Sequence, residues 1–247
     1  MSYSALWVCL GARGSGMSTL ALIQARLGSS RLPMKALLCL RGAPLIDWVT
    51  RRVAKSELLD RIVVAMPDTP LDAVLAEHVR ERLMPLDARI AVFCGPEHDV
   101  LERFRAAGAA FGAGRVVRVC ADNPLVWGGE IDHLIRFFEA TGCEYAYNHI
   151  PRNNRYPDGL GAEMLSFALL KELAAKASEP GQREHCLSYL WDNAQRFDIR
   201  TFDPPDPRLW HPELKLDVDS PEDYRRLALM PLQMDMPPEE IVALSGR

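Results

Sequence analysis

Short apolar runs rich in β-branched residues alternate with segments of helical periodicity between residues 19 and 140, and this alternation constrains the fold more than any other feature. Four of the runs are predicted strands: residues 19–24, 61–66, 89–94 and 115–120. Apolar side chains at helical spacing predict the amphipathic helices that separate and follow them: residues 44–55, 71–79, 99–111 and 131–140. Alternating strands and helices predict an α/β fold, with a mostly parallel central sheet and helices on both faces.

The pattern changes after Thr141. Residues 145–148 are a predicted strand, and residues 151–161 form a polar loop containing Pro and Gly. Two helices are predicted at 165–176 and 184–193, and the alternation of Leu and Val with Lys and Asp predicts a half-buried strand at 214–218. Ser220 then begins a helix as its N-cap, with proline and two acidic residues in the first turn.

Composition limits the partners that such a chain can have. It has 247 residues, of which 48% are hydrophobic, and a chain of this length can bury a full core without disulfides. Twenty-nine Lys and Arg against 33 Asp and Glu give a net charge of −4, which argues against a general nucleic-acid-binding protein. No apolar run approaches the roughly 20 residues of a membrane span. We therefore expect neither a nucleic-acid partner nor a membrane partner.

The cysteines predict a reducing compartment. None of the six forms a Cys-x-x-Cys pair, and the six histidines show no metal-ligand spacing. Cys120 ends an apolar run, as expected of a buried free thiol in the cytosol. The apolar residues 5–10 are few for a signal peptide, and no basic residue precedes them. The chain is predicted to be cytoplasmic.

A basic loop follows the first predicted strand, where the carboxyl ends of parallel strands form a ligand crevice. Gly28 allows close backbone approach, and cations and hydroxyls surround it: Arg26, Ser29, Ser30, Arg31 and Lys35. Such cations can neutralise several phosphate oxygens. The loop therefore predicts a phosphate site, against the simpler interpretation of a solvated basic turn.

Carboxylates follow two other predicted strands. Asp122 comes directly after the strand 115–120, and Asp219 shares a face with Asp217 at the end of the segment 214–218. Each can be explained locally, Asp122 by a turn and the second segment by helix capping, although capping does not require Asp219. Two carboxylates facing a basic loop are typical of the Mg²⁺–polyphosphate arrangement in phosphoryl and nucleotidyl transfer.

A P-loop-like spacing occurs at residues 11–18, but Met17 stands in place of the lysine that reaches the phosphates. The next predicted strand begins at Thr19, which leaves no room for the helix that a P-loop requires. We interpret residues 1–16 as an extension ahead of a single domain at 17–247.

The sequence resembles the cytidylyltransferase family that activates sugar acids, and in particular its homologues in spore-coat polysaccharide biosynthesis. The resemblance begins with Ile23-Gln-Ala-Arg-Leu-Gly-Ser-Ser-Arg-Leu-Pro-Met-Lys35. It continues in family order through residues 63–65, 99–104, 117–125, 156–159, 183–185 and 218–223, and spans about residues 19 to 230. Each segment is weak alone, and the ordered set is specific.

The resemblance implies a Rossmann-like nucleotide-diphospho-sugar transferase fold and roles for particular residues. Catalysis would involve Arg26, Lys35, Asp122 and Asp219, with both aspartates holding Mg²⁺. The nucleotide would be bound by Gln24, Ala25, Arg26, Gly28, Ser29, Ser30, Arg31, Lys35 and Asp122. The acceptor would be bound by Tyr156, Asp158, Gly159, Arg183 and His185. The family also implies a homodimer, which we assign to an acceptor and dimerisation subregion at about 141–200.

Three positions depart from the family pattern. Met34 stands where glycine is usual, Ala121 where glycine precedes the aspartate, and Gly161 where the closest homologues often carry aspartate. The expected function is transfer of CMP from CTP to a sugar acid or related acceptor, with release of pyrophosphate, in surface-glycan precursor synthesis. Alternatives are another nucleotide donor, a phosphorylated acceptor, or a non-catalytic nucleotide-binding paralogue.

Overall fold

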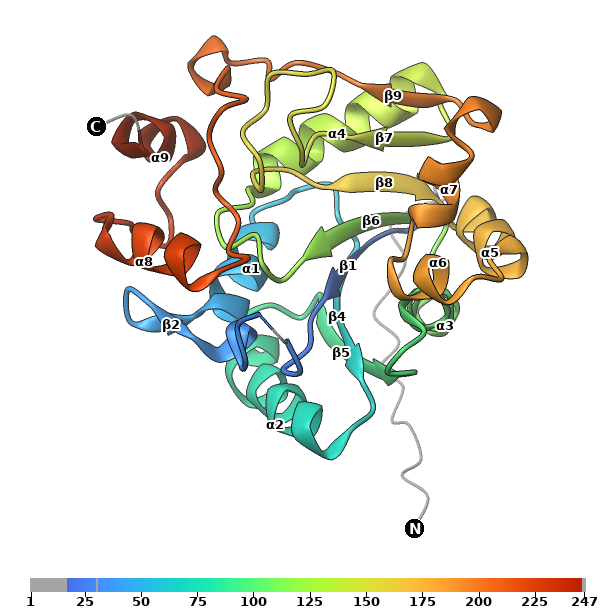
Figure 1. The fold of residues 1–247 in the computed structure, drawn as a ribbon, viewed down its shortest axis with the longest axis horizontal. Coiled ribbons are helices and arrows are strands. Elements are labelled where there is room, and N and C mark those ends of the chain that lie inside the picture. Colours follow the sequence, from blue (N-terminus) through green and yellow to red (C-terminus); the bar gives the residue numbers. More distant parts are fainter. Residues whose placement is uncertain (1–16, 30, 246–247) are drawn as a thin grey trace.

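A seven-stranded sheet organises the computed structural model, which describes residues 17–29 and 31–245 (Figure 1). The predicted extension and the P-loop-like residues 11–16 lie outside these residues, as does Ser30. The sheet has the order β5-β4-β1-β6-β8-β7-β9. Its strands are β1 (Thr19–Gln24), β4 (Arg61–Pro67), β5 (Ile90–Gly95), β6 (Arg115–Cys120), β7 (Tyr145–Tyr147), β8 (Glu163–Ser166) and β9 (Ile199–Thr201). A separate hairpin pairs β2 (Cys39–Leu40) with β3 (Ala43–Pro44).

Helices cover both faces of the sheet (Figure 1). One face carries α1 (Leu45–Val53), α2 (Pro70–His78) and α4 (Gly128–Thr141). The other carries α3 (Val100–Ala110), α5 (Phe167–Lys176) and α7 (Ser188–Asp192), with α6 (Pro180–Glu184) next to α3. The C-terminal part contributes α8 (Pro221–Leu229) and α9 (Pro238–Ser245). None of the helices in the described residues is both long and apolar enough to cross a membrane.

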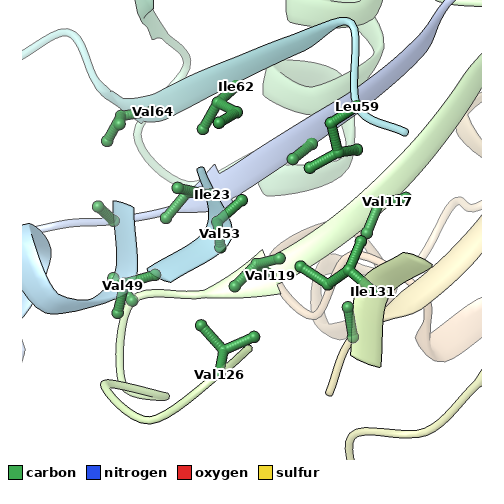
Figure 2. Close-up of a cluster of buried hydrophobic side chains, with 14 of the residues drawn as sticks. Ile23, Val49, Val53, Leu59, Ile62, Val64, Val117, Val119, Val126 and Ile131 are labelled. Carbon is green, nitrogen blue, oxygen red and sulfur yellow. The ribbon is translucent and has the colours of Figure 1, made fainter. Parts of the chain in front are cut away.

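The central strand β1 is buried on both faces because its neighbours β4 and β6 are parallel and helices lie above and below. Ala21 and Ile23 face α1 and α4, within the cluster of aliphatic side chains that Figure 2 shows. Leu20 and Leu22 face α3 and α5. Period-2 alternation places Gln24, the last residue of β1, on this second side.

A mostly parallel sheet between helical layers confirms the predicted fold class. β1, β4, β5 and β6 are mutually parallel, and only β8 runs antiparallel to its neighbours β6 and β7. Asp99 caps α3 as predicted, because its side chain accepts the backbone N–H of Glu102 at 2.9 Å. Ser220 likewise caps α8, in a reciprocal capping box with Asp223.

Three local expectations were wrong for tertiary reasons. Leu165 belongs to β8 and not to the following helix, because it pairs with Val116 across the sheet. The segment 214–218 makes only one bridge, between Lys215 and Asp158, and joins no sheet. The predicted helix 184–193 is broken at His185 into α6 and α7. The helix predicted at 71–79 is present as α2, although its Leu71 and Val74 are exposed and its buried residues include Asp72.

Candidate active site

The carboxyl ends of β1 and β6 border a cleft with an empty volume of about 770 Å³, which we call the phosphate cleft. Most of the predicted nucleotide-binding residues line it: Gln24, Ala25, Arg26, Ser29, Arg31, Lys35 and Asp122. Gly28 is exposed in the same loop, and a side chain there would meet nothing within 4 Å. The structure therefore gathers the basic loop and the first carboxylate in one place.

Lys35 connects the two predicted metal-binding carboxylates. Its Nζ lies 3.1 Å from Oδ2 of Asp122 and 3.8 Å from Oδ1 of Asp219. The same ammonium donates a 2.9 Å hydrogen bond to the backbone carbonyl of Val218. Because one cation reaches both carboxylates, Asp122 and Asp219 converge although they are far apart in the sequence.

Backbone contacts place Asp219 beside Asp122. The N–H of Val218 donates to the carbonyl of Asp122 at 2.8 Å, which fastens the two segments together. Asp223, in the first turn of α8, accepts the N–H of Asp219 at 3.1 Å. Asp219 thus comes from an extended segment held by a helix cap, and not from the end of a strand as predicted.

The basic loop is shaped by one buried carboxylate and one unusual backbone conformation. Oδ1 of Asp72, on α2, accepts the N–H of Leu27 at 2.8 Å. Met34 has φ 59° and ψ 19°, in the left-handed region, and its N–H donates to the carbonyl of Leu27 at 3.1 Å. This turn directs the chain into the short 3₁₀ helix Lys35–Leu37 and aims Lys35 at the carboxylates.

Further carboxylates crowd the same region. Burial, followed by the nearby charge of Asp158, raises the pKa of Asp217 to about 6. The pKa of Asp158 is also raised, mainly by burial. Lys215 offsets part of this negative charge, since its Nζ lies 2.9 Å from Asp223 and 3.9 Å from Asp219.

The donor set fits a divalent cation shared with a phosphorylated ligand. Within residues 17–29 and 31–245, no group of three or more His, Cys, Asp or Glu side chains is arranged to hold a metal by itself. Asp122 and Asp219 nevertheless supply hard oxygen ligands that converge on one cationic group. Mg²⁺ is commonly held by one or two carboxylates, with water and substrate phosphates completing the shell. The two aspartates fit that mode.

A second cavity, which we call the side pocket, has an empty volume of about 460 Å³ and shares Gln24 with the phosphate cleft. His185, predicted to bind the acceptor, lines it. The other lining residues are Arg118, His149, Glu163, Glu184, Leu187, Ser188 and Trp191. This pocket lies next to the phosphate cleft on the α3 side of the sheet.

The rest of the predicted acceptor set does not line the side pocket. Tyr156 is fully buried, and its hydroxyl donates to Glu130 at 2.7 Å. Asp158 and Gly159 lie beside the segment 214–218, where Gly159 has φ +85° and lies so close to Asp217 that a Cβ would come 2.8 Å from its nitrogen.

Arg183 is engaged in structural contacts. Its Nε lies 2.6 Å from Oδ2 of Asp99, the N-cap of α3, and its Nη1 donates to the carbonyls of Ala174 and Ala177 at the end of α5. Arg183 therefore fastens α6 to α3 and α5. The described structure brings only His185 of the five predicted residues to the side pocket.

Sequence reasoning missed Arg118, His149 and Glu163. Arg118 interrupts an otherwise apolar strand, and a charged residue at such a position is a signal that could have been used. Its partner Glu163 belongs to the strand β8 that the sequence pattern did not predict. The pair becomes recognisable only when β6 and β8 are placed side by side.

Comparisons with known proteins agree with this geometry. The family model described as cytidylyltransferase matches residues 20–220. The spore coat polysaccharide biosynthesis protein SpsF of Bacillus subtilis is 29% identical over 84% of this chain and 84% of its own. A 3-deoxy-manno-octulosonate cytidylyltransferase of Bdellovibrio bacteriovorus is 34% identical over 49% of this chain and 46% of its own.

A solved structure extends the likeness to the fold. A cytidylyltransferase from Leptospira borgpetersenii superposes with a TM-score of 0.80 and 24% identity, covering 92% of this chain and 93% of the other. The family match spans the phosphate cleft and both converging carboxylates. By sequence, this chain belongs to the cytidylyltransferase family.

Proposed function

We propose that this enzyme transfers CMP from CTP to a sugar acid or related acceptor, with Mg²⁺ as cofactor and pyrophosphate as the second product. The observation that carries the proposal is the Lys35 ammonium held between Asp122 and Asp219, at the floor of a cleft bordered by Arg26 and Arg31. Cations and carboxylates in alternation suit a triphosphate and its metal ion.

The residues support an in-line displacement. A hydroxyl oxygen of the acceptor would form a bond to the α-phosphorus of CTP and lose its proton to water, and the bond from that phosphorus to the bridging oxygen would break. The electron pair leaves with pyrophosphate, whose charge Arg26, Arg31 and Lys35 are placed to stabilise. Catalysis of this kind needs positioning and charge neutralisation, without a covalent enzyme intermediate.

The metal ion would be held by Asp122 and Asp219. When bound, Mg²⁺ supplies neutralisation of phosphate charge and orientation of the phosphates. Lys35 already reaches both carboxylates, so the chain itself keeps their mutual repulsion low before the nucleotide arrives.

The side pocket is the proposed acceptor site. It adjoins the phosphate cleft at Gln24, so a ligand there would meet a nucleotide in the cleft. Its lining includes Arg118, His149, His185 and Ser188, which suits a hydroxylated ligand. Relatives named for 3-deoxy-manno-octulosonate make that sugar acid the first acceptor to test.

A pyrophosphate-release screen tests the proposal. Each nucleoside triphosphate is combined with a panel of sugar acids, including 3-deoxy-manno-octulosonate, and of sugar phosphates, with and without Mg²⁺. We expect release with CTP and a sugar acid, dependent on Mg²⁺. Release with another triphosphate, or only with a sugar phosphate, would correct the donor or the acceptor, and no release with any pair would contradict the enzymatic proposal.

Site variants separate the two kinds of charge. Asp122→Asn and Asp219→Asn should lower turnover by about 100-fold or more, because a neutral amide is a poor ligand for a hard cation. Lys35→Ala should weaken CTP binding by about one to two decades and change its salt dependence, because it removes a cation from the phosphates.

The matched control is Asp198→Asn, which removes an exposed carboxylate paired with Arg200, and it should leave turnover unchanged. Pyrophosphate release and titration calorimetry with CTP provide the readouts. Turnover near the wild-type level in both Asp122→Asn and Asp219→Asn would exclude these aspartates from the reaction.

A further inference from the structure

Gln24 lines both the phosphate cleft and the side pocket. It is the last residue of β1, in register with Ala65 of β4 and Cys120 of β6, so the middle of the sheet holds its backbone. Its side chain extends to the α3 side of the sheet. The amide therefore lies where a nucleotide in the cleft and an acceptor in the pocket would meet.

Arg118 determines which way this amide faces. Oε1 of Gln24 accepts hydrogen bonds from Nε of Arg118 at 3.2 Å and from Nη2 at 2.8 Å. A guanidinium has only donors, so the amide oxygen must face it and the amide nitrogen must face away. Within residues 17–29 and 31–245, Nε2 of Gln24 donates no hydrogen bond, and it is not a buried unpaired atom. The two N–H donors of an amide that borders both cavities are thus available to a ligand.

Arg118 is itself fixed by a buried ion pair. Its Nη1 pairs with Oε1 of Glu163, the residue opposite it on β8, and the side chain of Glu163 is only 3% exposed. The hydroxyl of Tyr145, on β7, donates to the other oxygen of Glu163. Tyr145 thus orients the carboxylate of Glu163, Glu163 orients the guanidinium of Arg118, and Arg118 orients the amide of Gln24.

The protonation states of Glu163 and Tyr145 agree with these hydrogen bonds, in which Glu163 accepts and Tyr145 donates. Burial acts to raise the pKa of Glu163, but the charges of Arg118 and His149 and the hydrogen bonds from Tyr145 and Arg118 together hold that pKa below its usual value. Burial and the charge of Glu163 raise the pKa of Tyr145, which keeps its hydroxyl protonated as a donor. Arg118 and Glu163 are therefore both ionised, and the pair as a whole has no net charge with which to attract an anionic ligand.

We propose that Gln24 is a specificity-determining residue that donates from Nε2 to an oxygen of the acceptor, and that Arg118 and Glu163 are positioning residues that fix the direction of its amide. This inference rests on the proposed function, and it names the recognised group as a hydroxyl or carboxylate oxygen on the acceptor. The enzyme would select its acceptor through an N–H donor whose direction is fixed before the acceptor binds. The charge of Arg118 is already balanced by that of Glu163.

The experiment compares Gln24→Met, Arg118→Lys and their combination with the wild-type enzyme. Gln24→Met keeps the length of the side chain and removes both donors. Arg118→Lys keeps the charge beside Glu163 and loses the fork that orients the amide. The control is Arg89→Lys, because Arg89 is also partly buried and bonded to a carboxylate and to backbone carbonyls, but it lines neither cavity.

Steady-state kinetics with CTP and 3-deoxy-manno-octulosonate, or the panel acid with the fastest turnover, supply the readout. We expect the acceptor KM to rise about tenfold in both single variants while the CTP KM stays within about twofold. The double variant should be no worse than Gln24→Met alone, because Arg118 acts through Gln24. Arg89→Lys should lower the unfolding temperature without moving either KM.

Several outcomes would overturn the inference. An unchanged acceptor KM in Gln24→Met would remove the donor role, and a raised CTP KM with an unchanged acceptor KM would make Gln24 a nucleotide ligand. Additive effects in the double variant would assign Arg118 a role independent of Gln24. Failure of the wild-type enzyme to use any donor and acceptor pair is a separate result, which would contradict the proposed function and this inference with it.

Discussion

Met34 has a strained backbone conformation in the turn that leads to Lys35. It has a left-handed backbone, with φ 59°, directly before Lys35. A side chain with a Cβ is strained in that region, and glycine is not. This chain nevertheless forms the turn with methionine.

Two variants at this position test the strain. Met34→Gly should be more stable to urea than Met34→Ala by about 0.5–1 kcal/mol, because both remove the same side-chain contacts and only alanine keeps the left-handed strain. Equal stability, or a more stable alanine variant, would show that the turn is unstrained.

Gly161 lies at a position where the structure leaves no room for a side chain. A Cβ there would come 2.2 Å from Oδ1 of Asn148, whose side chain donates to the carbonyl of Glu130 and accepts the N–H of Ala162. The side-chain amide of Asn148 fills this space; it is buried, and its nitrogen and its oxygen each form a hydrogen bond. An aspartate at position 161 could not be accommodated unless Asn148 moved. The residue types at positions 148 and 161 therefore depend on each other.

At the scale of elements, Arg52 fastens the C-terminal segment to the sheet. Its side chain is fully buried in α1 and donates to the carbonyls of Leu125, Val126, Met234 and Met236, while its guanidinium lies 4.5 Å from the ring centre of Trp127. Burial lowers the pKa of Arg52 to about 9. One side chain thus satisfies the carbonyls of two segments that are not paired with each other as strands.

Arg52→Met should therefore destabilise the fold by about 3 kcal/mol or more, because several carbonyls lose their donor in the interior. Lys55→Met is the matched control, since Lys55 forms an exposed ion pair with Asp235 of the same segment, worth about 0.5 kcal/mol or less. Urea unfolding of both variants measures the difference, and similar losses would exclude a special role for Arg52.

At the scale of the whole molecule, we expect a homodimer that uses part of residues 141–200. Within the described chain, the sheet ends at β9, next to this segment. Leu190 of α7 is fully buried, and Tyr189 and Trp191 are partly buried against the same core. Light scattering at micromolar concentration should give twice the 27.7 kDa of one chain, and a mass near one chain would contradict the dimer.

The sequence alone determined the fold class and the phosphate side of the site. Strand length, helix caps such as Asp99 and Ser220, and the basic loop are local features, and local preferences act over a few residues. Parallel strands also require their carboxyl ends to meet at one edge, so the sequence places Lys35 and Asp122 at the same edge, and the adjacency of β1 and β6 in the sheet then brings them into contact.

Only the tertiary structure decided the acceptor side. Tyr156 and Arg183 occur in motifs that suggested binding, but one packs against Glu130 and the other fastens helices. Gln24, Arg118 and Glu163 come together because β1, β6 and β8 are neighbours in the sheet, although they are distant in the sequence. Side-chain environment depends on such long-range pairing, and no local pattern contains it.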